Sequence, residues 1–113
     1  MAILERDDRG AVAHLVMNTP ETLNALSDDM IAALDGALEA LESDETIRAV
    51  TLSGAGKAFC AGHTRREMSA ARQAEDKGAA AIADLFDRCS AMMMRIPRMP
   101  QPVIAQVHGL AAA

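Results

Sequence analysis

Two short apolar segments near the start of the chain, at residues 3–6 and 12–17, flank a polar run at residues 7–10. The run consists of two aspartates, an arginine and a glycine, and Asp and Gly are typical turn formers. The pattern predicts a β-hairpin whose second strand ends before Pro20.

The next hydrophobic pattern has the spacing of an α-helix. Ser27 is a predicted N-cap, and Asp28 and Asp29 fall in the first turn, where the positive end of the helix dipole favours acidic residues. The apolar residues that follow recur every three or four positions and form one face of a helix that ends near residues 43–44. They are Met30, Leu34, Leu38 and Leu41.

Residues 49–52 are a short apolar run that predicts a buried strand. Strand, helix and strand in succession favour a right-handed crossover and a partly parallel sheet. The fold class predicted from the pattern is therefore α/β.

The second half of the chain predicts one more helix and one more core strand. Residues 65–78 are polar and rich in alanine, which indicates a mobile loop or a marginal helix. After Gly78 a helical stripe begins, which we expect to stop at Pro97 and Pro100, before a strand at residues 103–107. The stripe comprises Ile82, Leu85, Phe86, Cys89, Met92, Met93 and Ile96.

Length and composition favour a single small domain over residues 1–113, without repeats or linkers. The apolar fraction of 50% overstates the core, because much of it is alanine and the only aromatic residues are two phenylalanines. A net charge of −5 argues against nucleic acid or an anionic membrane as partners, since both require an excess of Lys and Arg.

Cys60 and Cys89 are the two cysteines of the chain; their spacing permits a bond between them, but nothing in the sequence indicates a disulfide framework. The sequence has no leader of the signal-peptide type and no apolar run near 18 residues. We therefore expect a cytoplasmic location with both thiols reduced.

A run rich in small residues at positions 54–64 follows the predicted strand at 49–52 and contains Gly54, Gly56 and Gly62. It does not fit known phosphate-binding loops: the P-loop needs a glycine at position 51, and the dinucleotide fingerprint needs one at position 59. Taken alone, the first two glycines are better explained by a plain turn after a strand.

Other chemistry is weakly supported. Cys60 and His63 resemble half of a thiol or metal site, but neither has the further Cys or His partners that such sites need, so we expect no metal. The acidic residues fall mostly on polar helix faces, and Glu67 alone lies near the run at 54–64, as a site residue or a surface charge. Methionines at 92–94 and Met99 suit either the core or an acyl-chain pocket.

Three segments together resemble the amino-terminal half of the enoyl-CoA hydratase/isomerase (crotonase) family. They are Asn24-Ala25-Leu26, the run at 54–64, and residues 102–109. The resemblance implies the amino-terminal portion of the crotonase spiral fold and an acyl-CoA thioester as substrate, with coenzyme A as part of the substrate and no separate cofactor.

In that family a backbone oxyanion hole stabilises the enolate of the thioester. The resemblance assigns the first donor to the backbone N–H of His63, since fixed backbone dipoles stabilise a developing oxyanion without reorganising. It also implies contacts of CoA or acyl groups with these residues: Leu23, Ala25, Leu26, Ala61, His63, Thr64, Arg65 and Gly109.

This sequence departs from the family pattern at two positions. Thr64 replaces a common acidic residue, and Arg65 replaces an apolar one, which affects substrate orientation more than a backbone donor. Lys57, Arg65, Arg66 and Arg72 are the basic residues that could face the phosphates of CoA.

By the resemblance, the second oxyanion donor and the acid/base glutamates align beyond Ala113, so the 113-residue chain alone is expected to be inactive. A non-catalytic module that retains part of the CoA cleft, and a fragment without the catalytic half, are the alternatives. Relatives form trimers or hexamers, and we expect self-association here through an exposed stripe of Leu85, Phe86, Met92 and Met93.

Overall fold

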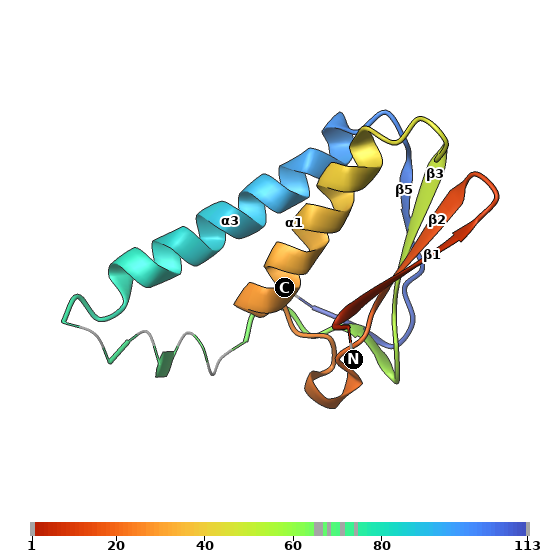
Figure 1. Cartoon of the computed structure of the whole chain (residues 1–113). Coiled ribbons are helices and arrows are strands. Elements are labelled where there is room, and N and C mark those ends of the chain that lie inside the picture. The colour runs from red at the N-terminus through yellow and green to blue at the C-terminus, as the bar shows by residue number, and fades with distance from the viewer. Residues whose placement is uncertain (1, 65–66, 68, 71, 74, 113) are drawn as a thin grey trace.

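The computed structural model describes residues 2–64, 67, 69–70, 72–73 and 75–112. The chain forms two layers, a twisted sheet and a pair of helices that both lie on one face of it (Figure 1). The α/β fold class is thus confirmed.

The larger sheet has the strand order β1-β2-β3-β5. β1 (Leu4–Arg9) and β2 (Val12–Met17) are antiparallel, whereas β3 (Ala49–Gly54) is parallel to β2, and β5 (Val103–Ala105) is parallel to β3. The predicted hairpin and the partly parallel sheet are therefore confirmed.

The hairpin turn is shorter than the sequence pattern predicts. β1 continues through the polar residues 7–9, because a two-residue turn at Gly10 and Ala11 suffices to pair Arg9 with Val12. Gly10 has a φ of 60°, which glycine adopts without steric cost. The acidic and basic residues of this strand are tolerated because β1 is an edge strand and most of its side chains are exposed.

The first long helix, α1 (Asp28–Glu42), has the predicted start and end. The Ser27 hydroxyl accepts a hydrogen bond from the Met30 N–H at 3.1 Å, a cap worth about 1 kcal/mol in typical helices. A short 3-10 helix, η1 (Pro20–Thr22), precedes it, and Ser43 follows as the C-cap.

The second long helix, α3 (Ala79–Arg98), packs beside α1 (Figure 1). It includes Pro97, which we expected to end it, and stops at Arg98, where the Met99 N–H closes the last turn on the carbonyls of Arg95 and Ile96. A proline in the last turn removes only one helical hydrogen bond, so the helix runs on to the next residue. Of the preceding residues 65–78, the structure describes Glu67, Ser69 and Ala70 as helical.

The core lies between the helices and the inner face of the sheet. Alternate residues of β2 point inward, and they meet the apolar faces of both helices. The largest contributors are buried to within a few per cent: Leu15, Met17, Met30, Ile31, Leu34, Leu38, Leu41, Val50, Leu85 and Met92.

Two predictions about apolar exposure are wrong. Leu85 and Met92 belong to the core and cannot take part in an exposed stripe, whereas Phe86 and Met93 are indeed about half exposed. The predicted core strand at 103–107 ends at residue 105 and is half exposed, because β5 is the last strand of its sheet and Ile104 points away from the helices.

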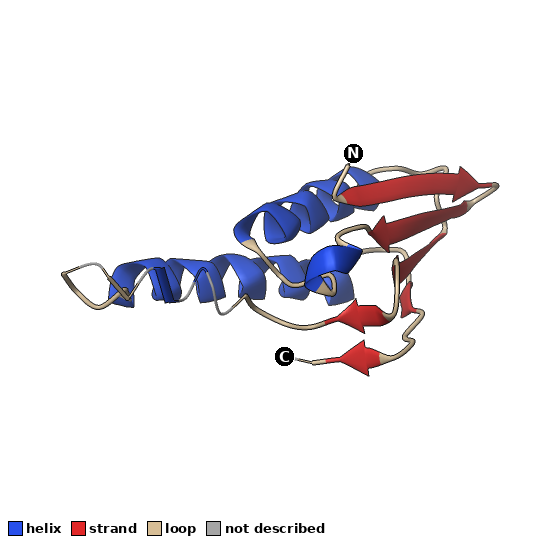
Figure 2. Ribbon diagram, turned by 90° about the horizontal axis from the view of Figure 1, so that it is seen from below, coloured by secondary structure: helices blue, strands red, loops and turns tan. Residues whose placement is uncertain are grey.

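The structure contains a second, two-stranded sheet that the sequence did not predict. β4 (Ala58–Cys60) and β6 (Leu110–Ala111) are parallel and lie beside each other at one side of the main sheet (Figure 2). Strands of two or three residues are too short to show a period in the sequence. They matter here because β4 leads directly into the residues of the candidate site.

Candidate functional site

The loop before α1 and the segment after β4 are joined by backbone hydrogen bonds. The Ala61 N–H donates to the Leu23 carbonyl at 3.0 Å, and the Leu26 N–H donates to the Gly62 carbonyl at 2.7 Å. Leu26 and His63 form a parallel β-bridge. Residues far apart in the sequence that we predicted to share a site are therefore adjacent.

This pairing fixes the orientation of the peptide between Gly62 and His63. In a trans peptide the C=O and the N–H point in opposite directions. Because the Gly62 oxygen faces the Leu26 amide, the His63 N–H faces away from the loop, and it donates to no acceptor in the described part of the chain. Within the described residues, the bond at the Gly62 carbonyl therefore fixes this peptide and leaves its N–H without an acceptor.

The side chain of His63 has a different environment from its backbone. Its ring meets the Phe86 ring edge-on, with centroids 5.0 Å apart and an interplanar angle of 80°. The Nε2 atom is buried and has no hydrogen-bond partner among the described residues. The ring is thus packed as an aromatic group against α3, while the N–H of the same residue has no acceptor among the described residues.

Three residues of the loop before α1 were predicted to contact the ligand: Leu23, Ala25 and Leu26. Ala25 and Leu26 are buried, whereas the side chain of Leu23 is partly exposed. Leu23 and Asn24 both have left-handed backbone angles, with φ of 55° and 53°. Such angles are costly for leucine and common for asparagine. Local strain of this kind persists only where surrounding contacts fix it, and here the bond from the Ala61 N–H is one such contact.

Thr64 and Glu67 connect this segment to the start of α1. The Thr64 hydroxyl accepts from the Glu67 N–H at 3.2 Å, and the Glu67 carboxylate accepts from the Asp28 N–H at 2.9 Å. A carboxylate at this position satisfies a free amide of the first helical turn and suits the helix dipole. The structure therefore gives Glu67 a helix-capping contact.

The remaining predicted contacts are only partly placed. Arg65 and Arg66 lie outside the described residues, whereas Lys57 and Arg72 are exposed. Gly109 forms a bridge with Ala58, at the opposite end of β4 from His63, so it is not brought together with the other site residues.

Gly109 has a structural reason to be glycine. Its φ is 60°, and a Cβ there would collide with the carbonyl oxygen of Lys57. The side chain of His108 beside it contacts the Gly56 carbonyl at 2.7 Å. These contacts place β6 against β4, where the Ala112 N–H donates to the Cys60 carbonyl at 2.9 Å.

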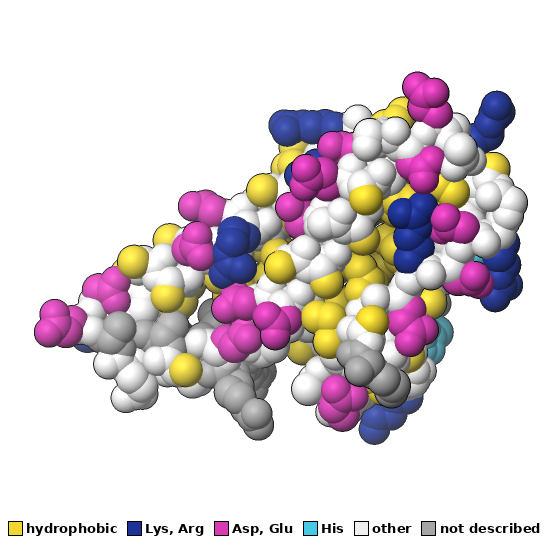
Figure 3. Space-filling view, viewed as in Figure 1, with side chains coloured by type: hydrophobic (Ala, Val, Ile, Leu, Met, Phe, Trp, Pro, Cys, Tyr) yellow, Lys and Arg dark blue, Asp and Glu magenta, His cyan; other side chains and the backbone are white. Residues whose placement is uncertain are grey.

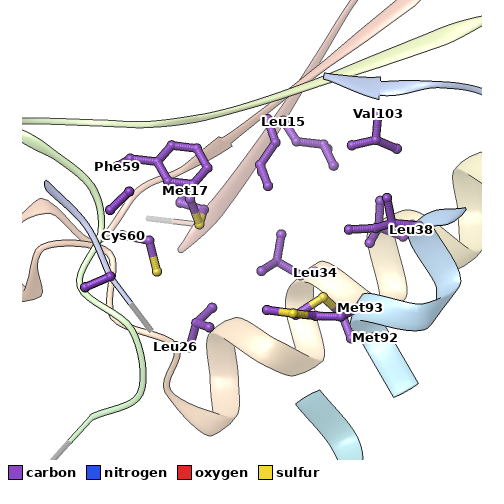
Figure 4. Close-up of a pocket in the computed structure, with 14 residues that line it drawn as sticks. Leu15, Met17, Leu26, Leu34, Leu38, Phe59, Cys60, Met92, Met93 and Val103 are labelled. Carbon is purple, nitrogen blue, oxygen red and sulfur yellow. The ribbon is translucent and has the colours of Figure 1, made fainter. Parts of the chain in front are cut away.

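An open apolar cleft of about 550 Å³ lies between the sheet and the two helices. Figure 4 shows side chains from the strands, such as Leu15 and Met17, opposite side chains from α1 and α3, such as Leu34 and Met92. Figure 3 shows hydrophobic side chains gathered between α1 and the sheet. Residues of β4 and β6 complete the wall, so the cleft reaches the segment that precedes His63.

The methionine cluster is divided between the core, the cleft wall and the surface. Met92 and Met93 line the cleft, Met99 is buried in the core, and Met94 is 49% exposed. Flexible thioethers suit a wall that meets apolar groups of variable shape.

Both cysteines are buried free thiols. The Sγ of Cys60 accepts a hydrogen bond from the Gly62 N–H at 3.4 Å, and burial, with a smaller contribution from Cys60, raises the pKa of Cys89. Within the described residues no group of three His, Cys, Asp or Glu side chains could hold a metal ion. In the same part of the chain, no helix is long and apolar enough to cross a bilayer.

Asn24 is a site residue whose role sequence reasoning missed. Its side chain is fully buried and bonds to three backbone groups, two of them more than 30 positions along the chain. The sequence signal was its place in the Asn24-Ala25-Leu26 motif, but the partners of a side chain at such separations cannot be deduced from spacing.

Comparison with known proteins places these features in a family. The family model described as enoyl-CoA hydratase/isomerase matches residues 12–112. The 1,2-epoxyphenylacetyl-CoA isomerase of Escherichia coli (strain K12) is 37% identical over 112 residues, which are 97% of this chain and 41% of the relative. The human protein named enoyl-CoA hydratase domain-containing protein 3, mitochondrial, is 33% identical, over 90% of this chain and 32% of the relative.

Solved structures agree with the sequence relatives. An enoyl-CoA hydratase from Mycobacterium smegmatis has a TM-score of 0.86 and 44% identity, over 96% of this chain and 41% of that one. Pseudomonas aeruginosa AtuE has a TM-score of 0.88 and 31% identity, again over 96% of this chain and 41% of that one. This chain thus spans about two fifths of the length of these structures and of the bacterial relative, and it has the fold of the corresponding portion of a crotonase-like domain, as the resemblance implied. The chain belongs to the enoyl-CoA hydratase/isomerase family.

Proposed function

We propose that the chain provides part of an acyl-CoA site, in which the His63 N–H donates a hydrogen bond to the thioester carbonyl. The observation that carries the proposal is the fixed peptide between Gly62 and His63: its carbonyl is held by the Leu26 amide, and its N–H is left unpaired among the described residues. A donor held in advance stabilises an enolate oxyanion more than a donor that must reorganise during the reaction.

The apolar cleft supports the same proposal. It has the volume and composition of a pocket for a small apolar group, and its wall includes Cys60, three residues before His63. The acyl chain would lie against Met92 and Met93 in this cleft, and the phosphates of CoA would face exposed basic residues such as Lys57. Coenzyme A enters as part of the substrate.

A second candidate is acyl-CoA binding without turnover. Glu67, the acidic residue closest in sequence to His63, accepts a hydrogen bond from the Asp28 N–H and is thereby engaged at the start of α1. The resemblance aligns the second oxyanion donor and the acid/base residues with positions beyond Ala113. Loss of one oxyanion donor typically lowers a rate by about 10²–10³-fold, so we expect the purified 113-residue chain to bind acyl-CoA without measurable hydration of crotonyl-CoA.

The binding test compares butyryl-CoA with butyl-CoA, a thioether of similar shape that lacks the carbonyl. In isothermal titration calorimetry the thioester should bind about tenfold more tightly, which corresponds to roughly 1.4 kcal/mol for one hydrogen bond. The His63→Ala variant keeps the N–H and should keep this preference. The His63→Pro variant lacks the N–H and should lose it, with circular dichroism as the check that it folds.

Two results would refute the proposal. One is equal affinity of the unmodified chain for thioester and thioether. The other is loss of the preference in His63→Ala with an intact fold, which would assign the contact to the imidazole.

Self-association and location complete the proposal. Phe86, Met93, Met94 and Ile104 are each about half exposed, and apolar groups of this kind are often covered in assemblies. A homo-oligomer, a trimer or hexamer, should therefore appear in sedimentation velocity, and a monodisperse monomer would contradict it.

The proposed cytoplasmic location is supported by the two free thiols, and cell fractionation tests it.

A further inference from the structure

Asn24 is a fully buried polar residue that lies beside the candidate site without belonging to its proposed ligand contacts. The side-chain Oδ1 accepts from the Thr19 N–H at 2.9 Å. The Nδ2 group donates to the carbonyls of Ala55 and Ala58, both at 3.0 Å. Both donor hydrogens of the amide are therefore used, and the side chain joins the loop before α1 to the turn before β4.

The space around this amide is closed. A Cβ placed on Gly54 would lie 2.7 Å from the Asn24 Nδ2 and 2.6 Å from the Phe59 carbonyl oxygen, both too close for a real contact. The glycine therefore allows the amide to approach the backbone of the turn. Neither the amide nor the turn can shift without displacing the other.

Asparagine is the residue type that this position requires. Its φ of 53° is in the left-handed region, which asparagine tolerates better than most residues. Aspartate has the same shape, but it would direct a second oxygen instead of an N–H group at the carbonyls of Ala55 and Ala58. Glycine would permit the backbone angle and remove all three side-chain bonds.

Asn24 lies one residue from Leu23 and two from Leu26, the loop residues whose backbone bonds orient the donor. Leu23, the preceding residue, accepts from the Ala61 N–H, and Leu26 donates to the Gly62 carbonyl. If the loop moved relative to β4, the Gly62 carbonyl would lose its partner, and the peptide that carries the His63 N–H could rotate. The Asn24 amide holds the loop against the start of β4, on the amino-terminal side of the peptide between Gly62 and His63.

We infer that Asn24 is a positioning residue, whose side-chain amide sets the register between the loop and β4 and thereby keeps the His63 N–H directed at the ligand. The inference rests on the proposed function, because it concerns the same donor. Asn24 acts through the backbone and touches no reacting atom.

The test replaces Asn24 with Asp, with Asn18→Asp as the control at the other asparagine of the chain, whose amide bonds at the edge of the sheet. A carboxyl buried against two carbonyls has a raised pKa, so it should titrate between about pH 5 and 8. When protonated it can donate to one carbonyl; when ionised it repels both.

We expect the unmodified chain and Asn18→Asp to keep a preference of about tenfold for butyryl-CoA over butyl-CoA at both ends of this range. In Asn24→Asp the preference for butyryl-CoA should fall to about twofold or less near pH 8, because most of the free energy of one hydrogen bond to the carbonyl is lost. Near pH 5.5 the preference should recover to at least about fivefold. A role confined to general stability would give no such recovery in the ratio of the two affinities. A preference in Asn24→Asp that matches the unmodified chain at both pH values would overturn the inference.

A ligand-free measurement separates this inference from the proposed function. Amide hydrogen exchange of Ala61 and Leu26, followed by NMR, reports the bonds between the loop and the segment after β4. It should be at least tenfold faster in Asn24→Asp near pH 8 than in Asn18→Asp under the same conditions. If the unmodified chain shows no preference for the thioester, the proposed function fails, while unchanged exchange in Asn24→Asp would refute the positioning role itself.

Asn24→Gly covers the case in which Asn24→Asp does not fold near pH 8. Glycine keeps the left-handed backbone angle and introduces no charge. We expect this variant to lose the carbonyl preference at every pH and to exchange the Ala61 amide faster. A folded Asn24→Gly chain with the full preference and the original exchange rate would overturn the inference.

Discussion

Gln101 offers the sharpest stability test, because one side chain joins the end of α1 to the start of β5. It is 5% exposed, and its Nε2 group lies 2.6 Å from the Leu41 carbonyl oxygen, 3.1 Å from that of Ile47 and 3.3 Å from that of Asp44. The next residue, Pro102, accepts from the Val50 N–H at 3.0 Å. We predict that Gln101→Met, which keeps the length of the side chain and removes the amide, destabilises the fold.

The magnitude follows from the alternative partners of each carbonyl. The Leu41 and Asp44 oxygens also accept backbone N–H groups, from Asp44 and Ile47. The Ile47 oxygen has no second donor in the described part of the chain, so losing Gln101 leaves it unsatisfied at about 1–3 kcal/mol.

Two smaller contributions partly cancel. The weakened bonds to the other two carbonyls cost about 1 kcal/mol together, and removal of the Gln101 Oε1, which is buried without a described partner, returns a similar amount. The expected loss for Gln101→Met is therefore about 2 kcal/mol, or roughly 10 °C in Tm for a chain of this size.

Urea unfolding followed by far-ultraviolet circular dichroism measures this loss. Gln101→Glu is the informative companion, because at neutral pH it places an unpaired carboxylate among three carbonyls and should cost about 3–5 kcal/mol. Its folded-state pKa would be raised, so the deficit is present above that pKa and should shrink as the pH falls towards about 4.5. A loss below about 0.5 kcal/mol in Gln101→Met, or a pH-independent deficit in Gln101→Glu, would refute the reasoning.

Three further predictions concern other parts of the chain. Gly109→Ala should destabilise by at least about 1 kcal/mol more than Gly10→Ala, since both glycines have a φ of 60° but only the former would press a Cβ on a neighbouring carbonyl; equal losses in chemical denaturation would contradict this. Backbone N–H bonds at the start of α3 lower the pKa of Asp76, so its carboxylate stabilises the fold above the unfolded-state pKa and loses this effect as the pH falls through the lowered value. Asp76→Ala should therefore lower Tm at pH 7 and match the unmodified chain once the pH lies below that lowered pKa; a deficit that persists in acid would argue for another cause. Cys60 and Cys89 are buried, and burial raises the pKa of Cys89, so a thiol reagent should label both slowly until urea is added, whereas rapid labelling of the native chain would contradict their burial.

Elements with a clear local signal were predictable from sequence. The capped start of α1 at Ser27 and its apolar face needed only residues within a few positions of one another. The strands β4 and β6 were not predictable, because two or three residues carry no period, and their pairing depends on the contact between Gly109 and Lys57.

The candidate site was predictable only in part, because the hydrogen bonds that shape it join residues far apart in the sequence. The family resemblance of the motif at 54–64 assigned the donor to the His63 amide, but spacing cannot tell that the Leu26 N–H holds the preceding carbonyl. The role of Asn24 was missed because its partners Ala55 and Ala58 are more than 30 positions away. Long-range pairing, and not residue type, decides which backbone group is left free.

The fixed peptide between Gly62 and His63 has a consequence for how the protein tolerates mutation. Because the His63 N–H, which has no acceptor in the described part of the chain, belongs to the main chain, a codon change at position 63 alters the ring that packs on Phe86 but keeps this N–H for every residue except proline. The position can therefore vary in side-chain size and polarity while the hydrogen-bonding group is inherited unchanged. One residue therefore combines a backbone N–H that is kept in most substitutions with a side chain that is free to change.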